Sequence, residues 1–296
     1  MTRRALALKL EPYFYTAPSL LLIAAIMLVP LVTGLSYAFH DLILLDPLSG
    51  DFVGLDHFRE MLDDDGFWTA LRNTVVWTAV SVALQFTFGL ILALLLNRPF
   101  PGRGLVQALV FLPWAVPGFL SGLTWAWLFN PVIGPLPHWL QGLGLLATPE
   151  NILSDPHLAL WGPIAANVWW GIPFFAITLL AALQSIPKDI YEAAAMDGAG
   201  PLLRFRRVTL PLLAPTIAIT VMLRTVWVAN FAELIVVMTK GGPADATQIL
   251  SSYIFTLAFQ RLDFGYASAV AAVLLLLLLA YAAAVMVLRH AMTERA

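Results

Sequence analysis

Long apolar stretches separated by short polar segments dominate the pattern of the chain. A helix needs about 20 mostly apolar residues to cross a bilayer, where only a helix or a closed barrel satisfies its own backbone. The longest runs lack the alternation that barrel strands require, as Leu274 to Leu279 illustrate. The pattern therefore predicts an all-α polytopic membrane protein with six transmembrane helices. They cover about residues 13–39, 74–96, 104–129, 158–183, 211–239 and 266–288.

The composition agrees with this prediction and excludes some chemistry. Of the 296 residues, 60% are hydrophobic and only 11% are charged, which is typical of membrane proteins rather than of soluble domains. The absence of cysteine excludes disulfides, thiolate metal sites and thiol catalysis. No internal repeat and no long linker divides the sequence. We therefore expect residues 1–296 to form a single transmembrane domain.

The positions of lysine and arginine predict the orientation, because basic residues are retained on the cytoplasmic side of a membrane. If the amino end lies inside, the inner segments contain 11 of the 16 basic residues. These are Arg3, Arg4, Lys9, Arg98, Arg103, Lys188, Arg204, Arg206, Arg207, Arg289 and Arg295. Both termini are therefore expected in the cytoplasm, together with the polar segment between the fourth and fifth spans.

This polar segment, about residues 185–210, has the signals of two short helices. Pro187 is a good starting residue, and strong helix formers follow it. Asp197-Gly198 then provides a stop, because glycine adopts the left-handed conformation that ends many helices. Gly200-Pro201 restarts the chain toward a basic, partly apolar second helix. The segment therefore predicts a cytoplasmic helix pair that docks onto another protein.

Several positions of this segment form a recognisable spaced pattern. They are Glu192, Ala193, Ala194, Asp197, Gly198, Arg204, Leu210 and Pro211. The pattern closely resembles the EAA loop of importer-type ABC transporter permeases, with Val208 where isoleucine is more usual. The resemblance implies that these residues couple the membrane subunit to an ATPase subunit. An ordinary basic loop that only anchors the topology is the alternative.

The resemblance also implies partners and a location. It implies a multi-pass permease subunit of an ATP-driven importer in a bacterial inner membrane, working by alternating access. Two ATPase subunits would bind ATP and Mg, because this chain has no G-x-x-x-x-G-K-[ST] loop that could hold ATP phosphates. This chain itself is expected to bind no cofactor or metal and not to be an enzyme. Other implied partners are a second permease, most often a different chain of similar design, an extracytoplasmic sugar-binding protein and membrane lipid. No nucleic acid is expected.

Two further stretches resemble the carbohydrate-uptake branch of these permeases, the maltose and trehalose type. They are Gly241-Gly242-Pro243, just after the fifth span, and residues 263–269, which open the sixth. The resemblance implies that the substrate is an oligosaccharide, a polyol or a sugar derivative. Gly-Gly-Pro also breaks helices anywhere, so plain turn chemistry is the alternative.

The fifth span contains an arginine, Arg224. An ionised side chain at membrane depth costs at least about 2.5 to 3.5 kcal/mol on insertion scales, so it usually faces a bundle interior or a water-filled cavity. The residues that share its helical face are Trp227, Val228 and Phe231. The family resemblance implies that this helix lines the translocation path, where an arginine and aromatic rings suit sugar hydroxyls or an anionic sugar derivative. Alternatively, Arg224 ties the helices together.

Asn230 and Glu233 are the other informative polar residues of the span, and helical geometry places them on a different face from Arg224. Arg224 and Glu233 are nine residues apart, too far to pair within one helix, so each needs a partner elsewhere. The alternative function is a proton-coupled secondary transporter that uses Glu233 and Arg224. Such folds commonly contain paired broken helices, and the sequence gives no sign of such a pair.

Overall fold

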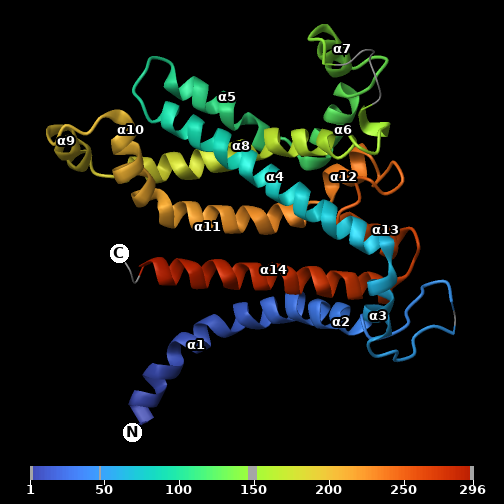
Figure 1. Cartoon of the computed structure of the whole chain (residues 1–296). Helices are drawn as coiled ribbons and strands as arrows, with labels where there is room; N and C mark the ends of the chain where they lie inside the picture. Colours follow the sequence, from blue (N-terminus) through green and yellow to red (C-terminus); the bar gives the residue numbers. More distant parts are fainter. Residues whose placement is uncertain (1–2, 47, 146–151, 294–296) are drawn as a thin grey trace. The chain divides into compact units, whose positions relative to one another are not determined.

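The computed structural model describes residues 3–46, 48–145 and 152–293, and the side chains of 13–46, 48–145 and 152–289 within them. This part of the chain is helical, with two isolated β-bridges, His40 with Phe52 and Ile43 with Asp263, in place of strands. Five helices are long and apolar enough to cross a membrane, and a bent helix pair makes a sixth candidate (Figure 1). The predicted all-helical membrane fold is confirmed.

The chain groups into two compact units. The first contains Met1–Asp64 and Ile254–Val273, and the second contains Asp65–Tyr253 and Leu274–Ala296. Two long segments therefore begin in one unit and end in the other: α13 (Leu250–Phe259) and α14 (Phe264–Thr293). The single domain expected from the sequence stays a prediction.

The first unit begins with α1 (Arg3–Ile23), the π-helical turn η1 (Ala24–Leu28) and α2 (Val29–Tyr37). A short helix, α3 (Asp56–Asp63), packs near the start of α14 through polar contacts. The Tyr266 hydroxyl donates to Asp64 Oδ2 at 2.6 Å, and His57 Nε2 lies 3.1 Å from the carbonyl oxygen of His40. These contacts fix the loop between α2 and α3 against the beginning of α14.

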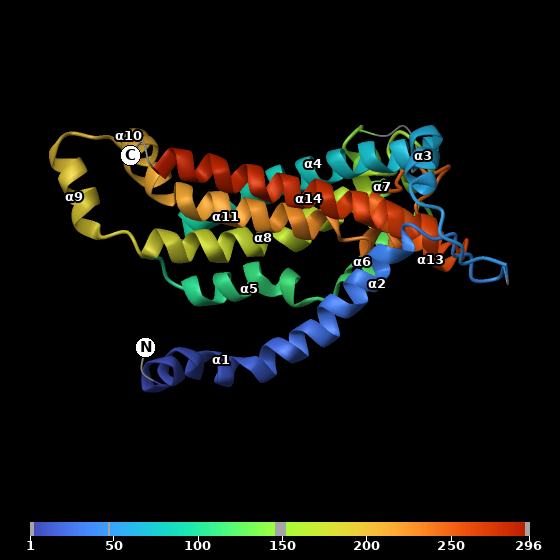
Figure 2. The ribbon, with the colours of Figure 1, turned by 90° about the horizontal axis from the view of Figure 1, so that it is seen from below.

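The second unit is built around α4 (Asp65–Leu96), α8 (Trp161–Gln184) and α11 (Leu210–Ala229), which lie side by side in Figures 1 and 2. Gly89 of α4 allows the close approach to α8, because a Cβ there would lie 3.1 Å from Ala176 N and 3.2 Å from Ile172 O. α5 (Arg103–Ala115) packs on the other side of α8. Trp77 and Phe175 are among the fully buried side chains at the centre.

The predicted third span, residues 104–129, is wrong as one continuous helix. It consists of α5 and α6 (Gly118–Leu128), which meet at an angle of 94°. Pro117 causes the break, because it lacks an N–H group and forces the preceding Val116 out of the helical region. Val116 is extended, with φ −79° and ψ 126°.

The predicted fifth span is also interrupted. α11 ends at Ala229, and α12 (Glu233–Met238) begins after a short break. Asn230 ends α11, where its side-chain amide donates to Val226 O at 2.9 Å. Asparagine favours such positions because its side chain competes for backbone hydrogen bonds. α12 packs on α6, so the two helix breaks lie in neighbouring elements of the second unit.

The other predicted spans match helices with shifted bounds, which are Tyr13–Tyr37, Asp65–Leu96, Trp161–Gln184 and Phe264–Arg289. The fifth lies within the candidate span Pro201–Met238. The second begins nine residues before the predicted start at 74 because α4 continues through its polar first turns. The connections contain α7 (Pro135–Gly142) and η2 (Ile152–Ser154), which the hydropathy pattern did not predict.

Candidate functional site

The polar segment between the fourth and fifth spans folds as two short helical pieces, as expected. α9 (Lys188–Met196) is followed by α10 (Pro201–Arg204) and a π-helical turn, η3 (Phe205–Thr209), which leads directly into α11. The turn between α9 and α10 contains Gly198 at φ +76°. Gly198 N–H donates to Ala195 O at 3.0 Å, and Ala199 N–H donates to Ala194 O at 2.9 Å. This is a Schellman termination, which uses glycine because side chains disfavour a positive φ.

The helix pair lies at one end of the second unit, beyond the ends of α8 and α11 (Figures 1 and 2). Glu192, Ala193 and Asp197 are exposed, whereas Ala194 and Arg204 are partly buried. Two large apolar side chains are open to solvent here, Met196 at 87% exposure and Leu202 at 63%.

The pair is also attached firmly to the transmembrane helices. The hydroxyls of Tyr191 in α9 and Thr209 in η3 lie 3.1 Å apart, within hydrogen-bonding distance. Leu210 and Pro211 form the first turn of α11. Because η3 continues into α11 without a loop, a displacement of the helix pair moves α11 directly.

Arg224 is the second feature of interest, and its partner comes from α4. Its Nε–H group donates to Gln85 Oε1 at 2.7 Å, and Gln85 Nε2 donates to the backbone oxygen of Asn167 in α8 at 2.9 Å. Arg224 is 2% exposed, and Gln85 and Asn167 are fully buried. Gly171 of α8 makes room for this chain, because a Cβ there would lie 2.5 Å from Gln85 Nε2 and would also clash with Arg224 Nη2. The chain thus links α4, α8 and α11.

Aromatic rings cover the guanidinium group. Arg224 Cζ lies 5.2 Å from the ring centre of Trp170 and 5.8 Å from that of Phe174, within the range of cation–π attraction. The ring of Phe231 stacks on Trp170 with centroids 5.1 Å apart. Trp170 Nε1 donates to Val116 O at 2.9 Å, which satisfies the carbonyl freed by the break before Pro117. The aromatic stack therefore connects Arg224 with the α5–α6 break.

A cavity of about 300 Å³ opens beside Arg224. Its lining residues are Trp170, Arg224, Val226, Trp227, Val228, Asn230 and Phe231. Trp227 and Val228 thus lie together with Arg224, as the helical face predicted, and Phe231, which follows the end of α11, also lines the cavity. The separate face predicted for Asn230 is wrong, because Asn230 lines the same cavity.

Glu233 does not belong to this group. Its side chain is exposed at the start of α12, and a Cβ added to Gly118 at the start of α6 would clash with its carboxylate. In the part of the chain that the structure describes, no ion pair joins Glu233 to Arg224. Among the described residues one helix pair, α5–α6, is sharply bent, whereas Pro201–Met238 forms a single candidate span, so the paired broken helices typical of the alternative function are not found there.

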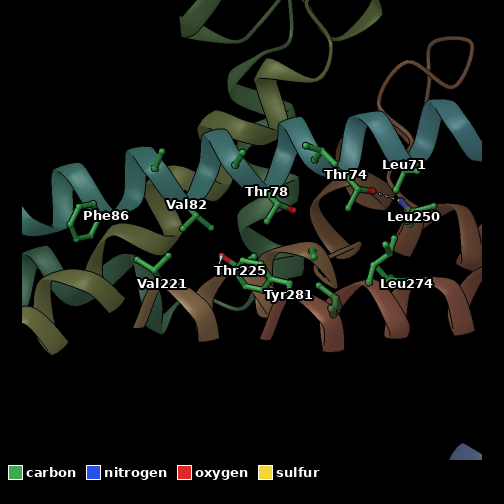
Figure 3. A pocket seen from close by; sticks show the side chains of 16 residues that line it. Leu71, Thr74, Thr78, Val82, Phe86, Val221, Thr225, Leu250, Leu274 and Tyr281 are labelled. Carbon is green, nitrogen blue, oxygen red and sulfur yellow. Dashed lines mark hydrogen bonds between the residues drawn. The ribbon is translucent and has the colours of Figure 1, made fainter. Parts of the chain in front are cut away.

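A larger cavity of about 580 Å³ lies between α4, α11 and α14 (Figure 3). The side chains facing it include Val82, Phe86, Val221 and Leu274, and most of its few hydroxyl groups bond within the protein, whereas Thr78 Oγ1 is buried without a partner among the described residues. Tyr281 donates to Thr225 Oγ1 at 3.1 Å, and Thr74 Oγ1 accepts from Leu250 N–H at 2.8 Å. A site this apolar suits hydrocarbon better than sugar. The smaller cavity beside Arg224 combines polar and aromatic groups and is the better candidate for a polar solute.

Sequence reasoning missed the positions that hold Arg224 in place. Gln85 could have been found, because a glutamine within a long apolar helix commonly bonds to a neighbouring helix. Gly171 carried no readable signal, since a glycine in an apolar run fits many roles. Asn167 and Trp170 likewise carry no local signal that links them to Arg224.

Comparisons with known proteins point in one direction. A model of the family described as "Binding-protein-dependent transport system inner membrane component" matches residues 85–292. The chain is 36% identical over 258 residues to the trehalose/maltose transport system permease protein MalF of Thermococcus litoralis, covering 87% of this chain and 86% of the relative. It is 35% identical over 260 residues to the sulfoquinovosyl glycerol transport system permease protein SmoG of Agrobacterium fabrum, covering 87% and 83%.

A solved structure is similar over nearly the whole chain. A chain of the bacterial alginate ABC transporter, in complex with alginate pentasaccharide-bound periplasmic protein, superimposes with a TM-score of 0.79. The identity is 25%, and the match covers 94% of both chains.

Proposed function

Because the chain belongs to the family of binding-protein-dependent transport system inner membrane components, we propose that it is the permease subunit of an ATP-driven ABC importer for a sugar or sugar derivative. It crosses the inner membrane several times and provides the path for the solute. The mechanism is alternating access, in which rigid helices tilt around a central site.

The observation that carries this proposal is the exposed helix pair Lys188–Arg204 at the end of α11. A pair of short helices with exposed Met196 and Leu202 suits docking into a groove of a soluble partner. In the proposed complex that partner is an ATPase, present as two subunits, which bind ATP and Mg. Its movements reach the transmembrane helices through η3, which continues into α11.

The remaining partners follow from the same proposal. An extracytoplasmic sugar-binding protein delivers the solute at the side opposite the helix pair, and a second permease of similar design completes the path. Both termini lie in the cytoplasm with the helix pair, in agreement with the distribution of basic residues. The last turns of α14 lie at the same end of the second unit as α10, which supports this orientation for the carboxyl terminus (Figure 2).

The test uses the complex purified with its genetic neighbours and reconstituted into proteoliposomes. Leu202→Asp introduces a charge into the exposed face of the helix pair. We expect this variant to lose the copurifying ATPase and the hydrolysis stimulated by a loaded binding protein. Val132→Asp is the matched control for copurification of the ATPase, since Val132 is 80% exposed in the connection between α6 and α7 at the other end of the unit. Normal ATPase copurification with Leu202→Asp, or equal loss of the copurified ATPase in both variants, would refute the docking role.

The proton-coupled alternative makes a different prediction for the same proteoliposomes. Uptake driven by an imposed pH gradient without ATP, and abolished by Glu233→Gln, would favour it. Uptake by the complex with its ATPase partners that requires ATP and persists in Glu233→Gln favours the importer. The exposed position of Glu233, away from Arg224, supports the second outcome.

A further inference from the structure

The guanidinium group of Arg224 is buried but mostly unsatisfied. Only its Nε–H group has a hydrogen-bond acceptor among the described residues, which is Gln85. Nη2 is fully buried without a partner, although the whole side chain is 2% exposed. A guanidinium has five N–H donors, so most of its hydrogen-bonding capacity remains free.

Its positive charge also has no counter-charge. None of the described residues that line the adjoining cavity is acidic, and Glu233 lies at Gly118 rather than at the cavity. Buried charges in proteins are normally paired, because an unpaired charge in a poorly solvated site is unfavourable. Trp170 and Phe174 provide cation–π attraction, but a ring face cannot accept the in-plane N–H groups in a fork geometry.

A purely structural tie between helices would look different. An arginine that only holds a bundle together has its N–H groups bonded to carbonyls or side chains of neighbouring helices. Here Gln85 accepts a hydrogen bond from a single N–H group of Arg224 and thereby orients the guanidinium plane. Gly171 leaves space where any side chain would push the guanidinium and Gln85 out of position. The arrangement holds the arginine in place while its Nη groups have no acceptor among the described residues.

The cavity has the composition of a small-molecule site. At about 300 Å³ it lies at the lower end of the range for ligand pockets, and aromatic and apolar side chains with a few polar groups form its walls. Trp227 is 47% exposed there, and Asn230 adds an amide at the end of α11. Aromatic faces suit the apolar face of a sugar ring, and the arginine adds the one full charge.

We infer that the transported solute carries an oxyanion, such as a carboxylate, sulfonate or phosphate, and that Arg224, oriented by Gln85, binds this group during translocation. The inference rests on the proposed importer function and specifies its substrate class: an anionic sugar derivative rather than a neutral sugar. The same oxyanion chemistry occurs in lipid headgroups, so the test separates the two sources.

The test measures uptake by the whole complex, with its binding protein, in proteoliposomes. The probes are matched pairs that differ only in charge: glucose with glucuronate, galactose with galacturonate, and cellobiose with its uronic acid form. The vesicles contain phosphatidylcholine with or without phosphatidylglycerol. We expect uptake of at least one anionic probe, and we expect it to exceed that of its neutral partner in both lipids.

The variants separate recognition from folding. Arg224→Gln should reduce the preference for the anionic probe about 10- to 100-fold, the range expected for a lost charge-assisted hydrogen bond. Arg224→Lys keeps the charge without the fork geometry and should retain part of the preference. Glu233→Gln is the control, because it removes a charge outside the cavity and should leave the preference unchanged. The ratio within a pair is insensitive to the amount of assembled complex.

Three outcomes would overturn the inference. Uptake of neutral probes alone, unchanged in Arg224→Gln, leaves the importer function standing and removes the anion site. Neutral uptake that requires phosphatidylglycerol and is lost in Arg224→Gln assigns the guanidinium to lipid headgroups. The absence of ATP-driven uptake of every probe, with no ATPase bound, refutes the proposed function itself and the inference with it.

Discussion

Gly171→Ala tests whether the position of the guanidinium group determines transport. A Cβ at residue 171 would lie 2.5 Å from Gln85 Nε2, whereas ordinary contact begins at 3.4 Å. The side chains of Gln85 and Arg224 must therefore move by about 1 Å. A shift of that size breaks or weakens the 2.7 Å bond from Arg224 Nε to Gln85 Oε1.

The energetic consequence can be bounded. Loss of a hydrogen bond to a charged group costs about 1.5 to 3 kcal/mol, and replacing glycine by alanine within a helix recovers about 1 kcal/mol. The global stability of Gly171→Ala should therefore fall by only about 0.5 to 2 kcal/mol. If the oriented guanidinium binds the solute, the KM for uptake should rise about tenfold, since each 1.4 kcal/mol is a factor of ten.

Gly89→Ala is the matched control on the facing helix. Its Cβ would meet the backbone of α8 at Ala176 N and Ile172 O, which cannot rotate away as side chains can. The helices must separate, and overpacking of this kind costs about 1 to 3 kcal/mol. We expect a lower thermal unfolding midpoint for Gly89→Ala in detergent, with a smaller rise in KM than in Gly171→Ala, because Gln85 on the same helix moves only with the backbone and is not struck directly. An unchanged KM in Gly171→Ala, with a stability loss like that of the control, would refute the reasoning.

Two further changes test local structure. Gly198→Ala places a side chain at φ +76° and should weaken the α9 termination by about 1 to 2 kcal/mol, which lowers ATP hydrolysis stimulated by the loaded binding protein. Gly102→Ala, at φ +79° outside the helix pair, introduces the same strain and should leave this hydrolysis unaffected. Thr74→Val removes the acceptor of the buried Leu250 N–H group and should destabilise the protein by about 1 to 3 kcal/mol in thermal unfolding, while an unchanged midpoint would mean that another acceptor replaces it.

The helix pair was predictable because its signals are local. Asp197-Gly198 and Gly200-Pro201 determine a helix end and a helix start within four residues, and the structure forms both there. No contact with distant parts of the chain is needed for these backbone preferences. Glycine and proline act on their own and adjacent dihedral angles, which the sequence states directly.

The helix breaks were not predicted because a hydropathy pattern does not show where the helix axis changes direction. Residues 104–129 remain apolar through Val116 and Pro117, so the run looks continuous although the axis turns by 94°. Proline within transmembrane helices is often tolerated without such a turn. Here Trp170, from a helix 54 positions away in sequence, supplies the donor that satisfies the freed carbonyl of Val116. That stabilisation depends on tertiary packing and could not be read from the local pattern.

The contacts of the candidate site within α11 were predictable from the sequence, whereas those between helices depend on tertiary packing. The spacing from Arg224 to Val228 lies within α11, so the helical face held for these residues. Asn230 caps the end of α11 and lines the cavity, although the helical projection placed it on another face. Gln85 lies 139 positions from Arg224, and only the fold brings them together. The charge of Arg224 indicated that a partner must exist but not which helix would provide it.

The two candidate regions are joined by one continuous helix. α11 begins directly after the helix pair and contains 20 residues, so it is about 30 Å long. Arg224 is fourteen residues, about 21 Å, from Leu210. A tilt of α11 imposed at Leu210 must displace Arg224 relative to Gln85 on α4 or carry α4 along, because their bond spans the two helices. In the proposed importer, a displacement of Arg224 relative to Gln85 would change the donors beside the cavity and would link docking at the helix pair to the binding and release of a solute.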